Sequence, residues 1–139
     1  MDADAFELQK SRIRALFDRW RDVLSLDEWE VTLNYRDGEF VKNDGTGSAN
    51  AIGLTAVAWE YRRAAIDFRC DMTVDEDDDE LEYIVLHEAM HILLNGMRSM
   101  REAGDNLGRA YETLFEEHTA TTLARAFIRA RDSGLRGSP

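Results

Sequence analysis

The sequence predicts an α+β fold in a single domain over residues 1–139: an N-terminal helix, a small twisted sheet of three or four mainly antiparallel strands, then two helices. Three observations support this prediction. Apolar residues recur every three or four positions near the N-terminus and again in the C-terminal half, which is helical spacing. Apolar and polar residues alternate over residues 29–36, which is strand spacing. The length suits one domain with its own hydrophobic core.

Net charge limits the partners. The chain carries a formal net charge of -11, which disfavours phosphate backbones and anionic membrane surfaces. We therefore expect no nucleic acid and no membrane partner. An acidic N-terminus without an apolar leader, and the lack of a bilayer-length apolar stretch, predict a cytoplasmic protein. The single cysteine, Cys70, excludes an internal disulfide, and we expect it to be a small buried residue in a strand rather than a zinc thiolate or nucleophile.

The N-terminal half contains the predicted helix and sheet. Residues 6–24 show the spacing of an amphipathic helix, and residues 29–36 that of a strand. Residues 37–53 are rich in Gly, Asn, Asp and Ser, so we interpret them as a loop that is either a simple excursion or a functional flap. Two apolar runs, 52–61 and 64–70, most simply form an antiparallel hairpin. An exposed strand edge would be a template for an extended peptide, but the pattern does not say which strand is the edge.

The C-terminal half contains two predicted helices. Nearly every residue of the run 75–82 is acidic. A calcium loop would need oxygen ligands at alternating positions and a turn-making glycine, so we interpret this run as the N-terminal cap of the next helix. That helix is predicted to end at Asn95 and Gly96, a usual helix-ending pair. After a connection over residues 97–104, a last helix is predicted over residues 105–131.

The first of these two helices carries the motif H-E-x-x-H, formed by His87, Glu88 and His91. At about 100° per residue, positions i and i+4 lie one above the other, so both imidazoles project from one face. Two imidazoles are two of the three protein ligands that a catalytic Zn²⁺ needs. Glu88 lies one step round the helix, where its carboxylate can take a proton from an attacking water, and it is our candidate general base.

A third ligand must come from elsewhere. The last helix offers four candidates: Glu112, Glu116, Glu117 and His118. Helical phase places Glu117 at the centre of the apolar face and Glu116 at its margin. An ionised carboxylate in a buried stripe is costly unless it is paired or binds a metal, so we predict Glu117 as the ligand. The alternatives are Glu116 as the ligand, or Glu117 paired with Arg109 or Arg125.

A donor to the substrate carbonyl is less clearly indicated. His118 could polarise a carbonyl or steady an oxyanion. A histidine beside an apolar face is, however, more often a satisfied helix residue. Tyr111 is a weaker candidate for the same role.

The segment His87 to His91, followed by Glu117 within Glu116-Glu117-His118, resembles the gluzincin metallopeptidases. The order of elements is similar to that of minimal single-domain minigluzincins, and to metallopeptidase-like proteins of phages and other mobile elements, including those that cleave a repressor. The resemblance implies a zincin-like fold and peptidase activity, with His87, His91 and Glu117 as zinc ligands and Glu88 as general base. The chain is too short for the downstream lobe with which larger gluzincins stabilise the transition state.

The sequence thus predicts a zinc-dependent metallopeptidase, an enzyme with Zn²⁺ as cofactor and a peptide or protein as substrate. The alternative is a zinc-stabilised, catalytically weak or inactive protein-binding module of phage or regulatory type. A third hypothesis is a metal-free packing domain in which the motif is accidental. Substrate identity, cleavage specificity, regulation and oligomeric state are not determined by these patterns.

Overall fold

The computed structural model describes residues 1–38, 51–99 and 106–136, and over 96–99, 106–115 and 135–136 it describes the backbone alone. Within these residues, four helices and a three-stranded sheet confirm the predicted α+β class. None of the described helices combines the length and apolar character needed to cross a bilayer. The elements in chain order are α1 (Ala3–Val23), β1 (Glu30–Arg36), β2 (Gly53–Ala58), the 3₁₀ turn η1 (Trp59–Tyr61), β3 (Arg63–Arg69), α2 (Cys70–Thr73), α3 (Asp78–Ser99) and α4 (Asn106–Arg136).

Helix α1 begins a few residues earlier than the predicted start because Asp2 caps it. The Asp2 carboxylate accepts hydrogen bonds from the backbone N–H groups of Asp4, at 2.8 Å, and Ala5, at 3.1 Å. The buried stripe of the helix consists of Gln9, Ile13, Phe17 and Trp20. Their spacing of three and four residues is the predicted amphipathic pattern, so one face of α1 enters the core.

The sheet has the strand order β1–β3–β2. Strands β2 and β3 pair antiparallel, which confirms the predicted hairpin, whereas β1 pairs parallel with β3. The sheet is therefore mixed, where a mainly antiparallel one was expected. Strand β3 lies at the centre and is the most buried strand, with Ile66 and Phe68 fully enclosed and Ala64 at 7% exposure. The two edges are β1 and β2, and most of the predicted loop over 37–53 lies outside the described residues.

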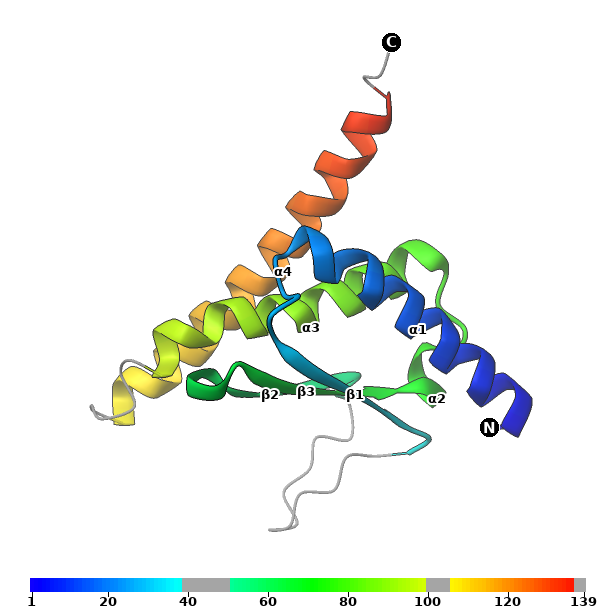
Figure 1. Ribbon diagram of the computed structural model, residues 1–139, viewed down its shortest axis with the longest axis horizontal. Coiled ribbons are helices and arrows are strands. Elements are labelled where there is room, and N and C mark those ends of the chain that lie inside the picture. The colour runs from blue at the N-terminus through cyan, green and yellow to red at the C-terminus, as the bar shows by residue number, and fades with distance from the viewer. Residues whose placement is uncertain (39–50, 100–105, 137–139) are drawn as a thin grey trace.

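The helices α1, α3 and α4 lie on one side of the sheet (Figure 1). Helix α3 is next to the sheet, and both α1 and α4 pack against α3. The core formed between these layers includes Phe17 of α1, Phe68 of β3, Leu81, Leu86, Met90 and Ile92 of α3, and Ala120 and Ala124 of α4. Because α3 is enclosed from several sides, residues on it are well placed to form a rigid site.

The acidic run caps α3 as predicted. The Asp77 carboxylate accepts a hydrogen bond from the backbone N–H of Glu80 at 2.8 Å. The predicted end of the helix at Asn95 and Gly96 is wrong, because α3 continues to Ser99. Glycine inside a helix costs only about 1 kcal/mol relative to alanine, so it permits helix continuation unless it adopts a left-handed conformation.

Glu82 departs from the other carboxylates of that run. Its side chain is only 3% exposed and lies inside the bundle instead of at the solvated helix end. It forms ion pairs with Arg19 of α1, at 3.0 Å, and with Arg131 of α4. Two guanidinium groups thus compensate one buried carboxylate, and this ion-pair cluster ties α1, α3 and α4 together.

Cys70 is fully buried, as predicted, but it is the first residue of α2, directly after β3, instead of a strand residue. Burial raises the pKa of its thiol to about 11. The thiol therefore stays protonated at neutral pH, which fits an apolar packing role.

Candidate metal centre

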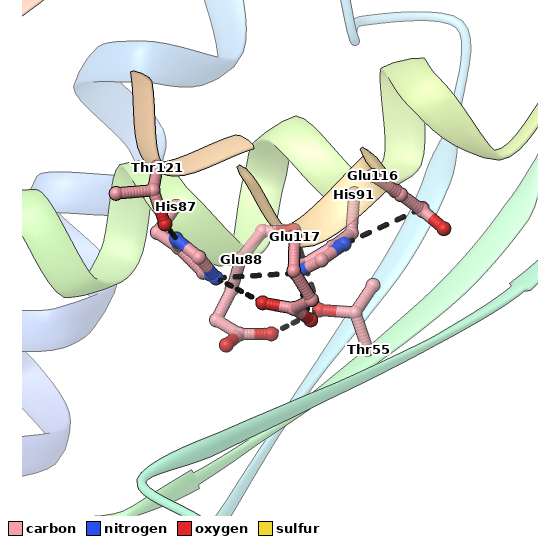
Figure 2. Close-up of polar contacts among 7 residues, drawn as sticks. All are labelled: Thr55, His87, Glu88, His91, Glu116, Glu117 and Thr121. Atoms are coloured by element: carbon pink, nitrogen blue, oxygen red, sulfur yellow. Dashed lines mark hydrogen bonds and ion pairs between the residues drawn. The ribbon is translucent and has the colours of Figure 1, made fainter. Parts of the chain in front are cut away.

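The imidazoles of His87 and His91 lie one helical turn apart on the same face of α3. Their Nε2 atoms are 3.2 Å apart, and their ring centroids are 4.9 Å apart. Figure 2 shows both rings directed toward one point below the helix. This is the arrangement that the i, i+4 spacing predicts.

Glu117 reaches the same point from α4. Its Oε2 lies 3.2 Å from Nε2 of His87, and its Oε1 lies 3.1 Å from Nε2 of His91. The carboxylate therefore faces both ring nitrogens at once, from the opposite helix (Figure 2). The structure brings all three predicted ligands together.

The predicted position of Glu117 at the centre of the buried face of α4 is wrong. Its side chain is 54% exposed, and Glu116 is the buried one of the two, at 8%. The buried stripe of α4 runs through Glu116, Ala120 and Ala124, each four residues from the next. Glu117 lies about 100° away from that stripe, at its border with solvent. A metal ligand must reach an accessible ion, so the border of the stripe suits it better than the centre.

Each imidazole has a second partner at its other nitrogen. Oγ1 of Thr121 is 3.2 Å from Nδ1 of His87, and Oε1 of Glu116 is 3.3 Å from Nδ1 of His91. A carboxylate accepts a hydrogen bond from an Nδ1–H group, which leaves the Nε2 lone pair free for a metal. The predicted alternative ligand, Glu116, thus contacts the outer side of the ring. Thr121 was not predicted, although its position one turn after Glu117 is a usable signal.

Glu88 lies below the two imidazoles in Figure 2 and is 7% exposed. Its Oε2 accepts a hydrogen bond of 2.5 Å from the hydroxyl of Thr55 on β2. One of its oxygens lies within 4.8 Å of the ligand atoms of His87 and His91. Burial raises the pKa of Glu88, and the Thr55 hydrogen bond opposes this rise. A buried carboxylate with a raised pKa has the properties of a general base.

Gly53 provides the space for this carboxylate. A Cβ atom at position 53 would lie 2.7 Å from Cδ and Oε1 of Glu88 and 2.8 Å from its Cγ. Real Cβ atoms essentially never approach this closely, so only glycine fits while Glu88 keeps its place. Thr55 and Gly53 were missed from the sequence because they belong to a distant strand.

The protonation state of His87 suits metal binding. Burial lowers the pKa of His87, the neighbouring His91 lowers it further, and Glu117 raises it. With burial as the largest cause, the neutral imidazole is favoured, and a neutral imidazole is the form that binds a metal. The ring of Tyr83, one turn before His87, packs edge-on against it with centroids 5.9 Å apart.

The structure describes the side chains of only two of the remaining candidates, His118 and Arg125. The side chain of His118 is exposed. Tyr111, Glu112 and Arg109 belong to the part of α4 that is described by its backbone alone. The guanidinium of Arg125 lies 4.3 Å from the centre of the Tyr83 ring, so its described contact is with an aromatic ring rather than with Glu117.

The spacing of the three donor groups matches a small divalent cation. Tetrahedral ligands at about 2.0–2.1 Å from zinc stand about 3.3 Å from one another. The nitrogen–nitrogen and nitrogen–oxygen separations among His87, His91 and Glu117 are 3.1–3.2 Å. Two imidazoles and one carboxylate also match the donor chemistry of zinc. The residues present therefore fit such an ion.

Comparisons of the chain with protein-family models, with curated protein sequences and with solved structures give no match. Functional assignment therefore rests on the geometry of the site.

Proposed function

We propose that the protein is a zinc-dependent peptide hydrolase. The observation that carries this proposal is the convergence of His87 and His91 with Glu117, beside the buried carboxylate of Glu88. Three protein ligands leave one coordination position open, which separates catalytic zinc sites from structural ones. The same geometry supports a relationship to the gluzincin metallopeptidases. The acidic charge and the single cysteine support a place in the cytoplasm.

Each residue has a distinct role in this proposal. His87, His91 and Glu117 would hold the ion, while Thr121 and Glu116 orient the two imidazoles. When bound, zinc supplies Lewis acidity, which lowers the pKa of a water and polarises a peptide carbonyl. Glu88 would accept a proton as the water oxygen adds to the carbonyl carbon. It would then donate that proton to the amide nitrogen as the C–N bond breaks, which releases an amine and a carboxylate.

The strand order indicates where a peptide would lie. Of the two edge strands in the described part of the chain, β2 is the one whose Thr55 contacts Glu88, so the edge of the described sheet formed by β2 borders the candidate centre. An extended peptide can pair with such an edge through main-chain hydrogen bonds, which require no particular side chains. We therefore propose that a peptide or unfolded protein segment binds along β2.

The test combines metal analysis with Glu88→Gln. Purified protein is expected to contain about one zinc per chain, and Glu88→Gln is expected to keep the zinc while losing about 10²–10⁴-fold in peptide hydrolysis. Glu80→Gln, an exposed change on the same helix, is the matched control. Equal turnover by Glu88→Gln and the parent on a quenched-fluorescence peptide library would show that Glu88 is not the base.

One observation favours the second candidate, a zinc-stabilised binding module. His118, the candidate carbonyl donor, is exposed on α4, and a donor acts strongly only in a site that excludes water. This candidate predicts stoichiometric zinc and lower stability after chelation, with no cleavage by either parent or variant.

A further inference from the structure

Two carboxylates lie close enough to the imidazoles to compete for one ion. Glu117 contacts the Nε2 atoms of His87 and His91 at 3.2 and 3.1 Å. Glu88 also has an oxygen within 4.8 Å of the ligand atoms of both histidines. A carboxylate that binds the metal can no longer serve as a free base. The proposed function therefore needs a device that separates the roles of the two glutamates.

Strand β2 lies beside both carboxylate oxygens of Glu88. The Thr55 hydroxyl donates to Oε2 at 2.5 Å, and the same hydroxyl oxygen is 3.2 Å from the backbone oxygen of Glu88. A threonine hydroxyl has one hydrogen, and the short distance assigns it to the carboxylate. The β-branched side chain also has restricted rotation, so the strand backbone sets the direction of the hydroxyl. Next to the other oxygen, the missing side chain of Gly53 leaves the space in which Oε1 lies.

We propose that Thr55 is a positioning residue that holds Glu88 out of the inner coordination sphere and thereby leaves Glu117 as the carboxylate ligand. This inference rests on the proposed function, because it requires that a divalent ion binds at His87 and His91. Without the Thr55 hydrogen bond, the Glu88 side chain is free to turn toward the imidazoles and occupy the position that catalysis needs open. Loss of one hydroxyl then strengthens metal binding and weakens catalysis.

The experiment compares Thr55→Val, which keeps the side-chain shape, with Thr55→Ser, which keeps the hydroxyl. Zn²⁺ affinity is measured by competition with a chromogenic chelator, and the ligand set is measured by visible absorption of the Co²⁺-loaded full chain. Thr55→Val is expected to bind Zn²⁺ at least about threefold more tightly and to shift the Co²⁺ bands, because a fourth protein ligand has been added. Thr55→Ser should restore both parent values. Thr32→Val, an exposed change on the other edge strand β1, is the matched control.

Repeating the Thr55→Val substitution in Glu88→Ala protein tests whether the change in metal binding acts through Glu88. In Glu88→Ala protein, Thr55→Val should change neither the Zn²⁺ affinity nor the Co²⁺ spectrum, because the competing carboxylate is absent. Gly53→Ala provides an independent variant if Thr55→Val does not fold, as judged by thermal denaturation. Its added Cβ displaces Glu88 from the other side, so it should also alter the Co²⁺ spectrum. The proposal is overturned if the folded variants keep the Co²⁺ spectrum and Zn²⁺ affinity of the parent. It is also overturned if Thr55→Val has the same effect in Glu88→Ala protein as in the parent.

Peptide hydrolysis measured on the same samples separates this inference from the proposed function. Thr55→Val is expected to lower kcat at least about tenfold with little change in KM. If the parent hydrolyses peptides and Thr55→Val matches it in rate and metal affinity, the positioning role fails and the hydrolase function stands. If the parent hydrolyses no peptide but Thr55→Val still changes the metal site, the hydrolase function fails and the positioning role stands. If the parent binds neither metal, both fail.

Discussion

The Glu116 carboxylate lies 3.3 Å from Nδ1 of His91, across the ring from the Nε2 atom that contacts Glu117 at 3.1 Å. Two adjacent residues of α4 therefore contact the same imidazole from its two sides. One contact can orient the ring, and the other can share its metal. Changing each glutamate alone separates these two roles.

Glu116→Ala is expected to lower Zn²⁺ affinity by about 10–100-fold, the usual effect of removing an outer partner of a metal ligand. Glu117→Ala removes a ligand and should weaken binding further, so that the protein no longer retains zinc after dialysis. Elemental analysis and chelator competition measure both effects. Glu60→Ala, an exposed change on η1, is the control. A greater loss of zinc in Glu116→Ala than in Glu117→Ala would assign the ligand to Glu116 instead.

Zinc should stabilise the fold, because its donors come from two different helices. At a free zinc concentration of 100 times Kd, the stabilisation is about 2.7 kcal/mol, provided that the unfolded chain does not bind. For a chain of this size that is a rise in Tm of roughly 5–12 °C. Thermal denaturation with zinc and with a chelator measures the difference. The double variant His87→Ala, His91→Ala should show no such difference, and an equal rise in parent and variant would place the metal elsewhere.

The pKa of Glu88 predicts a pH-dependent stability of the metal-free protein. Burial raises this pKa above the ordinary value of 4.5. The folded state therefore holds the Glu88 proton more tightly than the unfolded state, so the stabilisation is complete below the unfolded pKa and is lost as pH rises through the folded pKa. Glu88→Gln keeps a neutral side chain at every pH. Metal-free Glu88→Gln should accordingly exceed the parent in free energy of unfolding at about pH 8, with the gap closing toward about pH 4.

Urea denaturation in the presence of chelator measures this difference across the pH range. The control is Glu80→Gln, which should run parallel to the parent because that side chain is exposed. A gap between Glu88→Gln and the parent that widens as pH falls would contradict the assigned direction.

The buried carboxylate of Glu82 predicts unequal effects for its two arginine partners. Arg131 is 26% exposed and Arg19 is 62% exposed, so solvent weakens the Arg19 pair more. Arg131→Met is expected to cost about 2–4 kcal/mol of unfolding free energy, because a buried charge loses its better-shielded partner. Arg19→Met should cost about 1 kcal/mol or less. Urea denaturation ranks them, and a greater loss in Arg19→Met would reverse the assignment.

The matched control for these variants is Arg14→Met. Arg14 pairs with Asp18 on the exposed face of α1 at 3.2 Å, with both side chains about half exposed. Its loss should change stability by less than about 0.5 kcal/mol.

The elements of the fold were predictable where the pattern is local. Alternation placed β1, two apolar runs placed the β2–β3 hairpin, and three- and four-residue spacing placed α1, α3 and α4. Pairing of β1 with β3 was not predictable, because it joins residues far apart in the chain and depends on which strand is most enclosed. The end of α3 was misplaced because a glycine in sequence does not reveal its backbone conformation.

The candidate site was likewise predictable only where its residues follow a local pattern in the sequence. The i, i+4 spacing alone placed His87 and His91 on one face. Glu117 was selected by helical phase, but that phase locates a buried stripe, and the stripe proved to contain Glu116. Thr55 and Gly53 carry no local signal, since their meaning depends on the packing of β2 beneath α3. Whether the three converging groups bind zinc stays a prediction.

The parallel pairing of β1 with β3 constrains the order in which the strands pair during folding. Glu30 pairs with Arg63, so β1 is synthesised well before β3, its one partner strand among the described residues. The β2–β3 ribbon is local and can zip within about 1–10 μs, whereas docking of β1 must first close a longer loop and loses more chain entropy. During that interval β1 presents unpaired amides to any neighbouring polypeptide. Association with other nascent chains through this strand is the hazard that accompanies the topology.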